Sequence, residues 1–122
     1  MDAPQATTAI FDAWERGDAD AVARLFAEDG RYEDPLFPEP VVGPAAIREA
    51  LVPAMAEIRD VRIPVKALAT SDAGVAISEA SFLSELTSGE GRLDFDFAMV
   101  VEIRDGRIVR LCEYFDARGL AP

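Results

Sequence analysis

The chain has 122 residues, half of them hydrophobic, which is enough to bury the core of one domain of common size. Its formal net charge of −11 argues against nucleic acid and anionic membrane surfaces as partners, because both are bound through positive patches. It contains no histidine and one cysteine, Cys112, which excludes histidine triads, an internal disulfide and multi-cysteine zinc sites.

The sequence shows neither a transmembrane segment nor the pattern of a signal peptide. No apolar run reaches the roughly 18 residues of a transmembrane helix. The first residues, Met1 to Pro4, lack the basic and apolar regions of a signal peptide. We therefore expect a cytoplasmic protein, and the residue types present predict no metal site.

Two helices are predicted near the N-terminus. Residues 7–16 repeat apolar side chains at helical spacing and stop at Gly17, and Asp18 suits the N-cap of a second helix over residues 19–27. A short strand over residues 31–33 and a proline-rich loop over residues 34–42 follow. Gly43 and Pro44 then open a third helix, which we expect Pro53 to kink or divide.

Beyond Asp60 the apolar period changes from helical to about two, which is typical of strands. Asp105-Gly106 is a strong hairpin signal. The predicted order is α-α-β-α-β-β-β-β, a single α+β domain over residues 1–122 in which three helices cover one face of a curved antiparallel sheet and enclose a conical cavity. The last four strands are expected over residues 61–69, 75–86, 93–103 and 107–115.

Alternation along these strands predicts which side chains point toward the helices. On the last two strands the inward set would be large and mainly apolar. On the strand before them it would include Glu79 and Ser81. The acidic members of this face, Glu79 and Glu113, are either pocket carboxylates or solvated groups at the rim of the core. The expected inward set is Ile77, Glu79, Ser81, Leu83, Phe95, Phe97, Met99, Leu111, Glu113 and Phe115.

Asp34 stands where the short strand over residues 31–33 meets the proline-rich loop. A carboxylate fixed there beside aromatic and aliphatic side chains suits a general base. The alternative is that Asp34-Pro35 simply starts a turn, as this dipeptide does in many proteins. Tyr32, two residues earlier, is expected on the same face, where its hydroxyl can donate a hydrogen bond.

The whole chain resembles the SnoaL-like and ketosteroid-isomerase-like branch of the nuclear transport factor 2 superfamily. The resemblance rests on Phe26-Ala27-Glu28-Asp29-Gly30, Tyr32-Glu33-Asp34-Pro35, Gly43, Ile47, and Asp105-Gly106-Arg107-Ile108 followed by Glu113-Tyr114-Phe115-Asp116. It implies the cone-shaped α+β fold. It leaves the reaction open, because one fold hosts many chemistries.

By this resemblance Asp34 is similar to the aspartate base of ketosteroid isomerase, an enzyme whose oxyanion is held by a tyrosine and a protonated aspartate. The positions that match those two donors are Ile10 and Met99, and a supporting tyrosine falls at Leu51. The chain therefore departs from the steroid isomerases at its oxyanion donors.

The chain also resembles limonene-epoxide-hydrolase-like enzymes. Tyr32, Asp34 and Glu113 match three of their polar pocket residues. The arginine and second aspartate of that set fall at Glu79 and Ser81. SnoaL-like cyclases likewise use a pocket carboxylate, with no cofactor.

The resemblance implies a cofactor-independent isomerase or cyclase that acts on a hydrophobic, carbonyl-containing small molecule. Asp34, Tyr32 and Glu113 would be catalytic. One alternative is a binding or dimerisation module of the same fold without catalysis, and another is an epoxide hydrolase. A homodimer through the exposed sheet face is also expected, as is common in this family. The side chains expected to wall the substrate pocket are Trp14, Phe95, Phe97, Met99 and Phe115.

Overall fold

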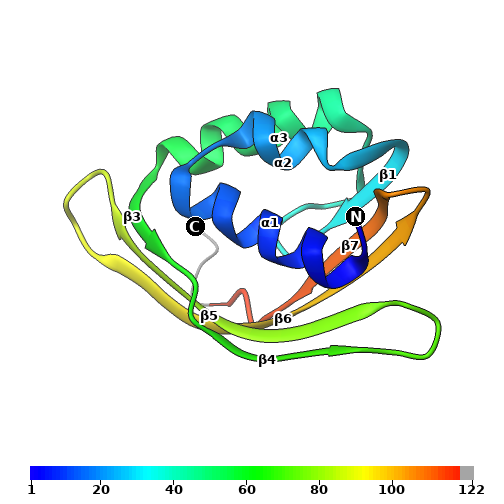
Figure 1. Cartoon of the computed structure of the whole chain (residues 1–122). Helices are drawn as coiled ribbons and strands as arrows, with labels where there is room; N and C mark the ends of the chain where they lie inside the picture. Colours follow the sequence, from blue (N-terminus) through cyan, green and yellow to red (C-terminus); the bar gives the residue numbers. More distant parts are fainter. Residues whose placement is uncertain (119–122) are drawn as a thin grey trace.

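The computed structural model describes residues 1–118, which form three helices on one face of a curved sheet (Figure 1). The predicted α+β architecture is confirmed. The helices are α1 (Ala3–Arg16), α2 (Ala19–Arg24) and α3 (Pro44–Ala56). The strands are β1 (Phe26–Glu33), β2 (Val41–Val42), β3 (Ile58–Arg62), β4 (Val65–Thr70), β5 (Ala76–Leu86), β6 (Arg92–Arg104) and β7 (Arg107–Tyr114).

The sheet runs in the order β2-β1-β7-β6-β5-β3, with β4 also paired to β5, and it does not close into a barrel. Its pairs are antiparallel with one exception, because β1 lies parallel to β7. β1 is also longer than the predicted strand over residues 31–33. This parallel pair was not predicted, and it carries Glu33 to the level of Cys112.

The N-terminal helix begins earlier than its apolar repeat suggests. Asp2 and Gln5 form a capping box, in which the Gln5 backbone N–H donates to Asp2 Oδ1 at 2.9 Å and the Gln5 side chain accepts from the Asp2 N–H. As predicted, α1 ends at Gly17, whose φ of 66° is left-handed, and Asp18 caps α2.

Helix α2 ends three residues before the predicted limit. The Ile108 N–H donates to the Leu25 carbonyl at 2.9 Å, and Phe26 pairs with Ile108. Pairing with the last strand therefore draws residues 26 and 27 out of the helix and into β1. Tertiary contacts have overridden a helical pattern at this point.

Two prolines lie within or between predicted elements. Pro53 does not divide α3, which continues through it as one helix to Ala56, and it stands in the exposed last turn. The segment predicted as one strand over residues 61–69 is divided instead. β3 ends at Arg62 and β4 begins at Val65, with Pro64 between them.

Strand β5 presents the opposite face from the one predicted. Ala80 pairs with Phe97 and Ser78 with Met99, so the small side chains of β5 face the helices. Ile77 and Glu79 are exposed on the outer face. Small residues on the inner face leave room for the large side chains of β6, which explains why apolar size was a poor guide to burial here.

None of the helices among residues 1–118 is long and apolar enough to cross a membrane. The core lies between α1, α3 and the inner sheet face, and its largest fully buried side chains include Tyr32, Phe26, Ile10 and Leu51. Tyr32 stacks on Phe26 with ring centroids 5.8 Å apart. This packing fixes the end of β1, from which the proline-rich loop starts.

Gly30 allows the close approach of β1 to β7. A Cβ atom at Gly30 would lie 2.6 Å from the Ile108 carbonyl oxygen and 3.0 Å from that of Ala27, and both are backbone atoms that cannot step aside. We predict that Gly30→Ala lowers the free energy of unfolding by about 1–3 kcal/mol, the usual cost of overpacking. Urea unfolding followed by far-ultraviolet circular dichroism measures the change.

Gly17→Ala is the matched control for that measurement. Gly17 has a left-handed φ, but nothing lies within 4 Å of its added Cβ. We expect Gly17→Ala to lower the free energy of unfolding by about 1 kcal/mol, which is the cost of holding an alanine in a left-handed backbone conformation. Equal stability of Gly30→Ala and the unchanged chain would show that β1 and β7 are not tightly apposed.

Candidate functional site

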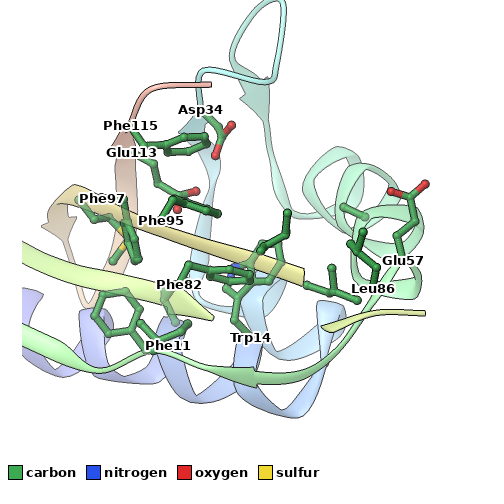
Figure 2. A pocket seen from close by; sticks show the side chains of 16 residues that line it. Phe11, Trp14, Asp34, Glu57, Phe82, Leu86, Phe95, Phe97, Glu113 and Phe115 are labelled. Atoms are coloured by element: carbon green, nitrogen blue, oxygen red, sulfur yellow. The ribbon is translucent and has the colours of Figure 1, made fainter. Parts of the chain in front are cut away.

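A cavity of about 220 Å³ lies between the helices and the inner face of the sheet (Figure 2). Its lining comes from α1, α3, β3, β5, β6 and β7 and from the segments that follow β1, α3, β3 and β7. The lining residues are Ile10, Phe11, Trp14, Asp34, Ala54, Glu57, Ile58, Ile63, Phe82, Leu86, Leu93, Phe95, Phe97, Met99, Glu113 and Phe115.

Aromatic rings make up much of the wall. Phe95 is central, with ring centroids 5.4 Å from Phe82, 6.3 Å from Phe97 and 4.8 Å from Phe115. Trp14 packs edge-on against Phe82 at 5.8 Å. The five wall residues predicted from the sequence, Trp14, Phe95, Phe97, Met99 and Phe115, all line the cavity.

Phe11 and Phe82 also line the cavity, and the sequence reasoning missed them as wall residues. Phe82 was missed because the faces of β5 were assigned in the wrong order. Phe11 follows Ile10 in the apolar stripe of α1, so helical spacing alone could have placed it beside Trp14. It meets Phe97 edge-on with centroids 5.9 Å apart.

Two carboxyl groups, Asp34 and Glu113, stand at one end of the cavity, and Glu57 and Leu86 stand at the other (Figure 2). Asp34 directly follows β1, and its Oδ1 accepts the Leu36 backbone N–H at 2.8 Å. Asp34 is therefore a turn former and a cavity residue at once. The turn fixes its carboxylate at the mouth of an apolar space.

The environment of Glu113 perturbs its titration. Its pKa lies well above the usual glutamate range, first because burial disfavours the charged form and second because the negative charge of Asp34 repels a second one. Hydrogen bonding to Asp34 raises this pKa further, and a hydrogen bond from Tyr32 opposes the rise. Glu113 is therefore neutral over a wider pH range than an exposed glutamate.

Tyr32 contacts Glu113 and Trp14 from the core and is not part of the cavity lining. Its side chain is 1% exposed and packs edge-on against Phe37 at 5.6 Å. Burial raises the pKa of the Tyr32 hydroxyl, and the nearby carboxylates Glu113 and Asp34 raise it further. Tyr32 thus keeps its proton and holds Glu113 in place.

The structure does not bring Glu79 and Ser81 to the cavity. Both lie on the outer face of β5, where the Ser81 hydroxyl donates to Asp96 Oδ1 at 2.6 Å. Ile10 and Met99, which match the oxyanion donors of the isomerases, do line the cavity and supply only apolar atoms. The polar groups of the site therefore come from Asp34, Glu113 and, at the far end, Glu57.

Within residues 1–118, no three His, Cys, Asp or Glu side chains are arranged to hold a metal ion. Two carboxyls in different environments can themselves act as a base and an acid.

Comparison with protein families identifies the fold. Residues 7–111 match the model of the SnoaL-like domain family. Among solved structures, a protein with a ketosteroid isomerase-like fold from Catenulispora acidiphila, in complex with trimethylamine, superposes with a TM-score of 0.82. The two share 21% identity, over 93% of this chain and 87% of the other.

Two further solved structures carry different activities in their names. An epoxide hydrolase from M. tuberculosis has a TM-score of 0.77 and 23% identity, over 94% of this chain and 83% of its own. A putative polyketide cyclase from Pseudomonas putida has a TM-score of 0.80 and 20% identity, over 95% and 92% of the two chains. At these identities the likeness establishes the fold alone.

The raised pKa of Glu113 predicts a pH dependence of stability. The folded chain holds this proton more tightly than the unfolded chain, so its contribution is complete at low pH and is lost as pH rises through the folded-state pKa. We expect Glu113→Gln to reduce the loss of unfolding free energy between pH 5 and pH 8 by about 1 kcal/mol or more. Urea titrations at the two pH values measure it.

Glu90→Gln is the control, because it removes the same charge from an exposed turn between β5 and β6. It should leave the pH dependence as it is in the unchanged chain. If Glu113→Gln also leaves it unchanged, Glu113 does not titrate differently in the folded state.

Proposed function

The chain belongs to the SnoaL-like domain family, and from its cavity we propose that it is a cofactor-independent acid–base enzyme. Its substrate would be a hydrophobic small molecule that contains a carbonyl group. Asp34 would be the general base, and neutral Glu113 would donate a proton or hydrogen bond to the carbonyl oxygen. The reaction would be an isomerisation or a ring closure.

One observation carries this proposal. Asp34 and Glu113 meet at the same end of an otherwise largely apolar cavity, and their surroundings differ. Asp34 accepts a backbone N–H and lies at the start of a loop, whereas burial and the charge of Asp34 raise the pKa of Glu113 well above the usual glutamate range. Two carboxyls in such different environments can serve as the base and the acid of one reaction.

The reaction steps follow from these roles. The Asp34 carboxylate would remove a proton from the carbon next to the carbonyl, the electron pair of that C–H bond would form a C=C bond, and the C=O π pair would move to the carbonyl oxygen. Glu113 stabilises the developing oxygen charge through its O–H. Asp34 then returns the proton to another carbon, which gives an isomer. In a ring closure, the enol carbon attacks a second carbonyl of the same molecule instead.

Glu113 would replace the missing oxyanion donors. Ile10 and Met99 cannot donate, so the O–H of Glu113, which stands at the same end of the cavity as Asp34, would take that part. Tyr32 would act as a positioning residue, since its hydroxyl lies close to Glu113 and its side chain is buried in the core. This refines the sequence-based prediction, which gave Tyr32 a direct part in catalysis.

The size of the cavity bears on the substrate. A cavity of about 150 Å³ can hold benzene, and pockets for drug-sized ligands span roughly 300–1,000 Å³. At about 220 Å³, this cavity suits one or two rings, or the reacting end of a longer molecule. The cavity is smaller than a site that encloses a whole four-ring steroid would need to be.

The epoxide-hydrolase alternative has less support. The positions that match the arginine and second aspartate of that site, Glu79 and Ser81, lie on the outer sheet face. A binding module without catalysis would use the same apolar walls, but it has no need for a neutral acid beside a carboxylate. Turnover distinguishes the two possibilities.

Exchange of carbon-bound protons tests the base without knowledge of the final product. We predict that the enzyme, in D₂O, catalyses deuterium uptake next to the carbonyl of small cyclic ketones and enones, as followed by NMR. Asp34→Asn should lower the rate about 10²–10⁴-fold, because it removes the base but retains the acceptor for the Leu36 N–H. Glu113→Leu should lower it about 10²–10³-fold.

Asp94→Asn is the matched control, because it removes one exposed carboxylate from the outer face of β6. Its exchange rate should equal that of the unchanged enzyme. If Asp34→Asn retains the full exchange rate, Asp34 is not the base. If no ketone in the panel exchanges faster than in buffer while the ketones do bind, the non-catalytic alternative holds.

We also infer that two copies pair through the outer face of the sheet. Ile77 and Tyr114 are about half exposed there, at 49% and 53%, and Val100 on β6 pairs directly with Ile77. Ion pairs flank this apolar centre, including Lys66 with Asp96 at 2.9 Å. An apolar centre with a charged rim is the usual anatomy of a protein interface.

Light scattering at tens of micromolar tests this pairing. We expect the unchanged chain to be a dimer and Ile77→Lys to be a monomer, because a buried unpaired charge opposes association. Val52→Lys is the control, since Val52 is 43% exposed on α3, away from the sheet face. A monomeric unchanged chain contradicts the inference.

A further inference from the structure

The charged side chains that line the cavity are all acidic. Among its lining residues, which all fall within the described part of the chain, three are acidic and none is lysine or arginine. Arg110 precedes Glu113 on the same strand, but it lies on the outer face of the sheet. Its Nε is 2.9 Å from Glu33 Oε2 there. The negative charge of Asp34 therefore has no cationic partner within the cavity wall.

The remaining wall is rich in aromatic rings. Six of the sixteen lining residues are aromatic, namely Phe11, Trp14, Phe82, Phe95, Phe97 and Phe115. They form a continuous set of contacts with centroid separations between 4.8 and 6.3 Å. Aromatic faces attract cations through their quadrupole, and this attraction is strongest where water is excluded.

The acidic lining and the aromatic wall both favour a positively charged ligand. An anionic ligand would meet Asp34 without a compensating cation, and a neutral one would leave Asp34 unpaired in an apolar space. A substituted ammonium group carries its positive charge among methyl or methylene groups. It can therefore bury apolar surface against the rings and pair with the carboxylate at once.

We propose that the cavity selects organic ammonium ligands, with the substituted nitrogen seated among the aromatic rings and facing the Asp34 carboxylate. This selectivity concerns what the cavity holds and does not depend on proton transfer by Asp34. If the proposed reaction also holds, its carbonyl substrate carries a basic nitrogen.

Three probes of the same shape and different charge test the selectivity. Choline, its neutral carbon isostere 3,3-dimethylbutan-1-ol, and the anion 3,3-dimethylbutanoate are each titrated into the full-length protein. Trp14 is the only tryptophan of the chain and lines the cavity, so its fluorescence reports occupancy. We expect choline to bind at least about tenfold more tightly than the alcohol, and the anion more weakly than both.

Two variants measure how much the Asp34 carboxylate and the Phe95 ring each contribute to the preference for choline over the alcohol. Asp34→Asn should reduce the preference for choline over the alcohol by about fivefold or more, whereas Asp94→Asn, on the outer face, should leave it unchanged. Phe95→Leu removes a ring and keeps apolar volume. It should weaken choline about threefold and leave the affinity for the alcohol nearly the same.

The inference is overturned if the alcohol binds as tightly as choline, or if choline causes no saturable change in Trp14 fluorescence. It is also overturned if Asp94→Asn lowers the preference as much as Asp34→Asn, since net charge alone would then explain it. Loss of proton exchange in Asp34→Asn together with no preference for choline would refute this selectivity and leave the proposed reaction standing.

Discussion

The parallel pairing of β1 with β7 is the constraint on which the site depends. It sets Tyr32 opposite Leu111 and Glu33 opposite Cys112, so the next residue on each strand brings Asp34 to the level of Glu113. The two acids come from opposite ends of the chain. A slip of β1 by one residue would put Asp34 out of level with Glu113 and turn its side chain to the other face of the sheet.

Local signals in the sequence predicted the parts of the fold that local chemistry decides. Gly17, Asp18, Gly43 and the Asp105-Gly106 hairpin act through their own backbone angles and nearest hydrogen bonds, and each appears where it was expected. The parallel strand pair was not predictable in this way. Phe26 leaves a helical pattern only because Ile108, far along the chain, offers it a partner.

Strand alternation predicted the cavity residues correctly only on strands whose larger side chains face the helices. On β6 and β7 the large side chains do face the helices, so Phe97, Met99 and Glu113 were placed correctly. On β5 the inner face holds mostly alanine and serine together with Phe82, and Ile77 points outward. Size is a guide to burial only where the opposing layer leaves space, and that depends on packing between elements.

The closeness of the two carboxyls limits what the cavity can do. Burial and the charge of Asp34 raise the pKa of Glu113, because a second charge in this apolar space would repel the first. In the reaction that we propose, Asp34 would accept a proton from a carbonyl compound, and the negative charge would move to the substrate oxygen beside the Glu113 O–H. The cavity would then keep its net charge through the reaction, so the aromatic wall would not need to reorganise to solvate a new charge, and preorganised catalysis depends on that condition.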